Sequence, residues 1–250
     1  MGSALRTIRD LTGRADVDGV RSAFSAVFSA YEGQGRPPRK PISIVIEAMP
    51  IMGATQSMAD GHILHVALHA TKGEMLHGLV AHEMGHMVLT EEGHPSHDPE
   101  TQDRAMSRLA VHGGLRRGFN RLAPEAINHA QDIYADDLAI PLVVADRAYP
   151  FFAEWIRNAA SSPPGPWEDV AATITIGVAL GKLERHGFLR ANDPVWREAK
   201  DFAARRKVMG LDRIAAFYRN LPTSVTRSQY VDVLAGLLQL VLAEVHAKQK

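Results

Sequence analysis

The chain contains no cysteine among its 250 residues. Disulfides and thiolate metal ligands are therefore excluded, so any metal site has to be built from His, Asp or Glu side chains. A lack of cysteine is also typical of proteins in a reducing compartment, and we expect a cytoplasmic location.

An excess of charge of either sign is also missing, since 28 lysines and arginines balance 28 aspartates and glutamates. Such a balance gives no reason to expect a nucleic-acid partner. The longest apolar runs, Ala171–Gly181 and Val233–Ala243, are too short to cross a bilayer as helices. The first residues, MGSALRTIRD, lack the apolar segment of a signal peptide. We therefore expect a soluble protein without a membrane span, and the sequence carries no signal for an oligomeric state.

The apolar residues follow the patterns of both helices and strands. Residues 4–32 carry them at helical spacing, whereas Pro41–Met49 is rich in β-branched residues and is predicted to be a buried strand. A turn-like stretch, residues 53–62, leads into His62–Ala70, whose alternation predicts a second strand at a sheet edge. A helix is predicted to begin at Thr71, where Glu74 completes a capping box. The sequence therefore predicts an α+β fold, with a small sheet packed on this helix and a mainly helical C-terminal half.

The clearest linker candidate is ASSPPGPWED, Ala160 to Asp169, which is rich in proline. We expect one domain over residues 1–160 and a helical subdomain over residues 166–250 that packs on it.

The segment GEMLHGLVAHEMGHMVLTEEG, Gly73 to Gly93, contains two histidines four residues apart. His82 and His86 share one helical face, and two imidazoles so placed can bind one Zn²⁺ at about 2.0–2.1 Å. Glu83 follows His82 directly, where a base can act on a metal-activated water. HEMGH is the His-Glu-x-x-His pattern of zinc peptidases. The alternative is an ordinary buried helix in which the pattern arises by chance among 12 histidines.

A catalytic zinc site needs a third protein ligand, and the best candidate segment is EAINHAQDIYADDLAIPL, Glu125 to Leu142. Asp132 and Asp136 are also four residues apart, so one can touch a metal while the other orients the N–H of a ligand histidine. Asn128 extends the same polar face one turn earlier. Spacing leaves Asp136 open as the direct ligand, with His129 as a weaker rival about 60° away around the helix. A solvated acidic helix face is the alternative to any metal role.

HEMGH followed by DIYAD resembles the gluzincins, the thermolysin-like clan of zinc metallopeptidases. Members carry a second helix with the pattern Glu-x-x-(Ser/Ala)-Asp, in which the Glu is the third zinc ligand and the Asp binds a ligand histidine. The resemblance implies Asp132 as the third ligand, Ala135 as the small residue and Asp136 as the partner of a histidine. Asp132 is one methylene shorter than the usual Glu, which requires the second helix to approach the first more closely. The resemblance covers about residues 42–142 and implies a zincin-like fold.

Other residues near the motif are weaker candidates. Gly85 costs about 1 kcal/mol of helix stability relative to alanine, and it would let another segment pack closely over the helix. His94 and His97 lie eight and eleven residues after His86, which does not fit the six-residue spacing of a metzincin third ligand. Three further histidines, His62, His65 and His69, could form a second metal cluster. We expect them instead at a sheet edge or in contact with solvent.

These patterns favour a zinc-dependent peptidase. One Zn²⁺ would be held by His82, His86 and Asp132, and Glu83 would be the general base on a metal-activated water. The partner would be a peptide or protein substrate, which the strand predicted at residues 62–70 would bind by strand addition. The alternative is a zincin-like module that binds metal, cleaves nothing and acts as a regulatory or partner-binding surface. An intact Glu83 favours the peptidase, because a purely structural site has no need of a base there.

Overall fold

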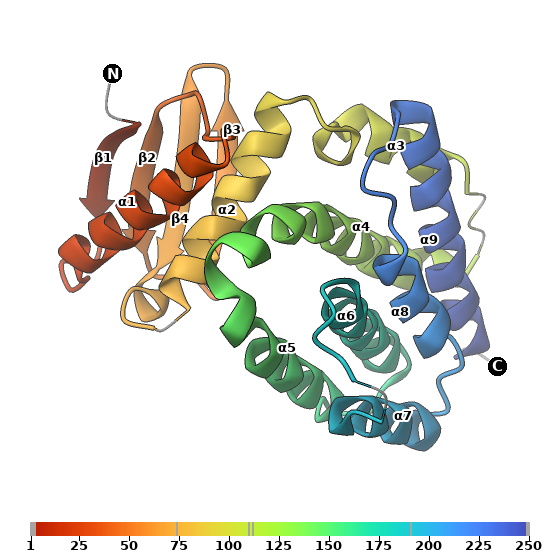
Figure 1. Ribbon diagram of the computed structural model, residues 1–250. Coiled ribbons are helices and arrows are strands. Elements are labelled where there is room, and N and C mark those ends of the chain that lie inside the picture. The colour runs from red at the N-terminus through yellow and green to blue at the C-terminus, as the bar shows by residue number, and fades with distance from the viewer. Residues whose placement is uncertain (1–3, 74, 110, 112, 191, 249–250) are drawn as a thin grey trace. The chain divides into compact units, whose positions relative to one another are not determined.

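The computed structural model describes residues 4–73, 75–109, 111, 113–190 and 192–248. Among these residues the chain has an α+β fold, with one four-stranded mixed sheet and otherwise helices (Figure 1). The chain forms two compact units, Met1–His97 with Tyr134–Ala145, and Asp98–Ile133 with Asp146–Lys250. The sheet belongs to the first unit, and the second is helical.

The sheet has the strand order β1-β2-β4-β3, made of β1 (Leu5–Asp10), β2 (Ile42–Glu47), β4 (Gly61–Ala67) and β3 (Gly53–Met58). Strand β2 pairs in parallel with both β1 and β4, whereas β3 pairs antiparallel with β4. Within the described part of the chain, β3 therefore has a free edge and β4 is paired on both sides.

Two of the expectations about this region are wrong. Residues 5–10 form β1 instead of the start of a helix, and helix α1 begins only at Val17 (Val17–Gly33). The stretch predicted to be a turn contains β3, so the strand predicted over residues 62–70 lies inside the sheet and not at its edge. In both cases pairing with a neighbouring strand outweighs local propensity, which is weak for short polar segments. The strand predicted over Pro41–Met49 is confirmed by β2.

The core of the first unit lies between the sheet and two helices, α1 and α2 (Leu76–Glu91). Alternate residues of β2 face this core, and they are in register with the buried face of β4: Ile42 with His62, Ile44 with Leu64, and Ile46 with Val66. Helix α1 lies against α2, which in turn contacts β3 (Figure 1). Each fully buried Ile or Leu contributes about 1.5–3 kcal/mol, so this core fixes α2 against the sheet.

Helix α2 begins later than the sequence predicts. Thr71 donates its hydroxyl to the carbonyl oxygen of Leu68 at 2.8 Å and so closes a 3₁₀ turn, Leu68–Ala70. The helix then begins at Leu76. The other residue of the predicted capping box, Glu74, lies outside the described residues.

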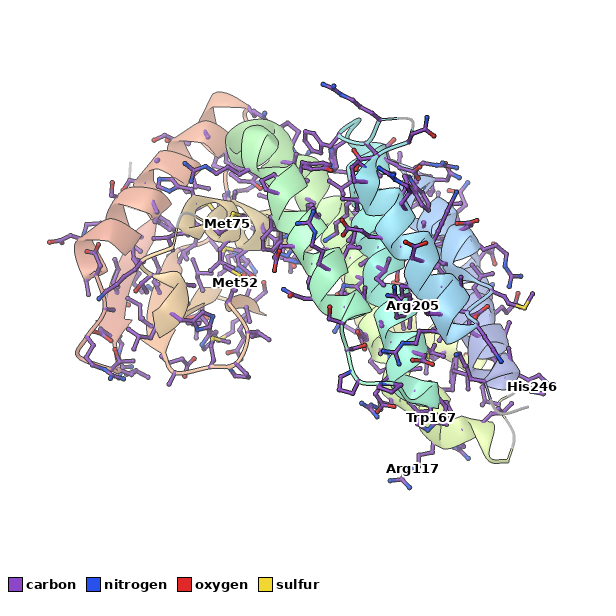
Figure 2. The ribbon with its side chains drawn as sticks, turned by 90° about the horizontal axis from the view of Figure 1, so that it is seen from below. Met52, Met75, Arg117, Trp167, Arg205 and His246 are labelled. Atoms are coloured by element: carbon purple, nitrogen blue, oxygen red, sulfur yellow. The ribbon has the colours of Figure 1, made fainter. Side chains whose placement is uncertain are left out.

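The described helices of the second unit are α3 (Pro99–Ser107), most of α4 (Leu115–Ala139), α5 (Ala145–Ala160), α6 (Pro166–Arg185), α7 (Pro194–Arg206), α8 (Leu211–Arg219) and α9 (Arg227–Ala247). Helix α6 is buried along most of its length and packs against α8. Trp167, at the start of α6, lies beside the first turns of α4 (Figure 2), where Gly118 leaves room for the indole ring. The unit is therefore a helical bundle built around α6.

The linker predicted at Ala160–Asp169 connects α5 to α6 inside the second unit. That residues 1–160 and 166–250 form two domains remains a prediction. One helix among the described residues, α9, is long and apolar enough to cross a membrane. Half of its apolar stretch is buried in the protein, and the core helix of a soluble protein would have the same length and composition. The buried residues of α9 include Leu234, Leu237 and Leu238.

Candidate metal centre

The two motif histidines lie on the one face of α2 that the core leaves accessible. Val80, Met84 and Met87 on the same helix are fully buried against the sheet and α1. His82 and His86 are only partly buried, and they are one turn apart. The apolar pattern of α2 therefore orients the helix, and the orientation places both imidazoles on the face opposite the sheet.

The two imidazole rings turn their Nε2 atoms toward each other, 3.1 Å apart. Their other ring nitrogens are both engaged: Nδ1 of His82 lies 2.7 Å from Oδ1 of Asp136, and Nδ1 of His86 lies 2.7 Å from Nε2 of His97. Because a carboxylate only accepts, His82 carries its proton on Nδ1 and presents a bare Nε2. Two nitrogens bound to one tetrahedral Zn²⁺ at about 2.0–2.1 Å would lie about 3.3 Å apart. The observed separation suits such an ion.

Asp132 completes the cluster. A ligand atom from each of His82, His86 and Asp132 lies within 4.8 Å of the others. Asp132 and Asp136 are one turn apart in the continuous helix α4, so the contact between Asp136 and His82 also directs Asp132 toward the histidines. His129 lies outside this group, with its Nδ1 3.4 Å from Oδ2 of Asp132.

Glu83 lies beside the cluster and is 5% exposed. Its carboxylate accepts a hydrogen bond of 2.8 Å from the hydroxyl of Thr55. Thr55 belongs to β3, the strand that the sequence analysis missed, and its polar edge-strand composition was the only available signal. The hydroxyl thereby fixes the orientation of the Glu83 carboxylate.

Helix α4 passes directly over Gly85 of α2. A Cβ atom at Gly85 would lie 2.8 Å from the carbonyl oxygen of Ala135 and 3.0 Å from its Cα. No larger residue than glycine fits there without moving α4. The resemblance to the gluzincins leads us to expect such a close approach of the two helices, because it places an aspartate, Asp132, where members carry a glutamate.

Replacing Gly85 with alanine is therefore expected to displace α4 and to weaken zinc binding by about 10-fold or more, because crowding of a packed contact costs about 1–3 kcal/mol. The matched control is Gly236→Ala in α9, where the new methyl group meets nothing within 4 Å. That control is expected to stabilise the protein by up to about 1 kcal/mol. Zinc affinity, measured by chelator competition, checks both; equal affinities in the two variants would contradict the packing argument.

Residues 39–240 match a protein family described as a family of unknown function, DUF5781. The chain belongs to this family. The matched segment contains the whole of α2, Asp132 and Asp136 of α4, and three of the four strands, β2, β3 and β4. No curated protein and no solved structure matches the chain. The description of DUF5781 names no activity, so a function has to be argued from the geometry of the site.

The sequence predicts Asn128 as a further member of the polar cluster of this DUF5781 member. Its side chain is exposed, because the polar face of α4 turns outward one turn before Asp132. Asp136, by contrast, is 6% exposed, and its Oδ1 lies 2.7 Å from Nδ1 of His82, which is the contact that the resemblance implies.

The other three histidines of the region lie apart from one another. His62 is buried with Glu91, from which its Nε2 lies 2.8 Å, and His65 lies 2.6 Å from Glu47. His69 is exposed. Burial alone would raise the pKa of Glu91, but hydrogen bonds from the backbone of Lys40 and from His62 hold it below its ordinary value. Among the described residues, the one group that can hold a metal is therefore the cluster on α2 and α4.

Proposed function

We propose that this chain is a zinc-dependent peptidase with a zincin-like fold. One Zn²⁺ would be held by His82, His86 and Asp132, and Glu83 would be the general base. The observation that carries the proposal is the convergence of two Nε2 atoms at 3.1 Å with an aspartate of a second helix. A set of two imidazoles and one carboxylate suits zinc, and it leaves a coordination position open for water.

The chemistry divides between the ion and the protein. Bound zinc would lower the pKa of a coordinated water and polarise the substrate carbonyl. Glu83 accepts a proton from the attacking water and passes it to the leaving amine. Asp136 holds His82 in the tautomer that leaves Nε2 unprotonated, and its negative charge makes that nitrogen a stronger metal ligand.

The substrate would bind along β3. Its free edge leaves backbone N–H and C=O groups that an extended peptide can pair with, whereas β4 has no free edge. Strand β3 also contacts α2, and Thr55 links it directly to Glu83. A peptide added to β3 would therefore run close to the general base, so β3 replaces residues 62–70 in the account of substrate binding.

Replacing Thr55 with valine is expected to lower kcat by about 10-fold with little change in KM. Valine has the same shape, but it leaves Glu83 without the donor that orients it, and hydrogen bonds to charged groups are worth about 1.5–3 kcal/mol. Thr55→Ser keeps the hydroxyl and should retain most of the activity. Steady-state kinetics with equal zinc content in all three proteins is the measurement. Unchanged kcat in the valine variant would exclude the orienting role of Thr55.

Cleavage of a broad peptide library tests the proposal itself. We expect defined internal cleavages, detected by mass spectrometry, that disappear with a chelator and return when zinc is added. If the protein holds one equivalent of zinc and cleaves no peptide, the peptidase proposal fails and a metal-binding module without activity takes its place.

A further inference from the structure

The loop after α2 turns back along the helix because of how the helix ends. Gly93 has a φ of +66°, a left-handed conformation that favours glycine. The N–H of Gly93 donates to the carbonyl oxygen of Thr90 at 3.1 Å, and the N–H of His94 donates to that of Leu89 at 2.9 Å. This pair of bonds is a Schellman motif. It directs the following residues, including the 3₁₀ turn Pro95–His97, back toward His86.

In this turn a chain of hydrogen bonds runs from His94 through Ser96 and His97 to His86. Nδ1 of His94 lies 2.7 Å from the hydroxyl of Ser96, which lies 2.8 Å from Nδ1 of His97. Nε2 of His97 lies 2.7 Å from Nδ1 of His86. Ser96 is completely buried, so the centre of the chain is protected from water.

One backbone group decides which atom donates and which accepts in each of these hydrogen bonds. The N–H of Ser96 donates to Nδ1 of His94 at 3.2 Å, so this nitrogen carries no proton. Burial lowers the pKa of His94, which favours the same neutral form. The hydroxyl of Ser96 then donates its proton to Nδ1 of His94. Its oxygen accepts a hydrogen bond from Nδ1 of His97.

The remaining bonds then have one direction each. In the tautomer with its proton on Nδ1, His97 has an unprotonated Nε2, which accepts the N–H of His86. His86 in turn has a bare Nε2, the atom that faces His82. Through this series of hydrogen bonds, the backbone N–H of Ser96 sets the tautomer of His86.

We propose that His97, held by Ser96 and His94, is a positioning residue that presents Nε2 of His86 to the metal. This inference rests on the proposed zinc site. It assigns the two ligand histidines different partners: His82 has the carboxylate of Asp136, and His86 has an imidazole. Partners of this kind orient a ligand ring and set its tautomer, and their loss costs about 10–100-fold in metal affinity.

The test is zinc affinity, measured on the full chain by competition with a chromophoric chelator. His97→Ala is expected to weaken zinc binding about 10–100-fold. His97→Gln is expected to recover most of this loss, because its amide oxygen can accept from His86 while its NH₂ donates to Ser96. Ser96→Ala should weaken binding in the same direction, since it releases His97. His69→Ala, which removes an exposed histidine, is the matched control and should bind zinc like the native chain.

The outcomes separate this inference from the proposed function. Native affinity in the folded His97→Ala variant overturns the role of His97 while the zinc site stands. Equal losses in the alanine and glutamine variants also overturn it, because the hydrogen bonds would then not matter. If His97→Ala does not fold, the glutamine and Ser96→Ala variants decide between the same results. A native chain that binds no zinc would instead refute the metal site itself.

Discussion

Replacing Glu83 with glutamine is expected to lower kcat/KM by about 10²–10⁴-fold, the usual contribution of a general base. Glutamine has nearly the same shape, and its amide oxygen can still accept the hydroxyl of Thr55, so the site should keep its geometry. It cannot accept a proton from water at neutral pH. Zinc content and thermal stability should therefore remain close to those of the native protein, and the measurement is cleavage of the best library peptide.

The matched control for Glu83→Gln is Glu154→Gln. Glu154 is exposed on α5 and lies 3.8 Å from Arg157. Its replacement removes the same charge without touching the proposed base, and activity should be retained. Full activity in the Glu83 variant would show that another group takes the proton.

Replacing Asp132 with alanine is expected to weaken zinc binding by at least about 100-fold, more than the loss of an outer partner costs. Asp136→Ala should cost about 10–100-fold, since it frees the ring of His82 but removes no ligand. Asp137→Ala is the control, because Asp137 neighbours Asp136 on α4 but lies outside the cluster. Chelator competition gives the three affinities.

The order of these losses decides which aspartate binds the metal. A larger loss for Asp136 than for Asp132 would reverse the two roles, which the spacing of the sequence left open. Asp132→Glu adds a further check: since Gly85 and Ala135 hold α2 and α4 in close contact, we expect the longer side chain to reach past the ion and to restore little of the affinity lost in Asp132→Ala.

Features that depend on the spacing of residues within one helix could be predicted from the sequence. The four-residue spacings of His82 with His86 and of Asp132 with Asp136 each define one helical face, and the structure brings these faces together. Gly85 indicated a close contact in the same way, and its partner is Ala135. Such spacings work because helical geometry converts sequence distance directly into position.

Features that depend on contacts between segments far apart in the sequence could not be predicted from it. Strand β3 has few apolar residues, and only its ladder with β4 makes it a strand, so Thr55 stayed hidden in an expected turn. The sequence analysis considered His97 only as a third metal ligand and rejected it because of its spacing. In the structure, the turn after Gly93 brings His97 to the ring nitrogen of His86 that faces away from His82. Tertiary contacts decided both positions.

Zinc K-edge X-ray absorption on the full chain, purified without added zinc, tests the central claim most directly. The account predicts about one equivalent of zinc, with nitrogen and oxygen neighbours at about 2.0–2.1 Å and the scattering pattern of two imidazoles. It also predicts that the imidazole signal is lost in a His82→Ala, His86→Ala double variant. A native protein without zinc, or a zinc site that keeps both imidazoles in that variant, would contradict it.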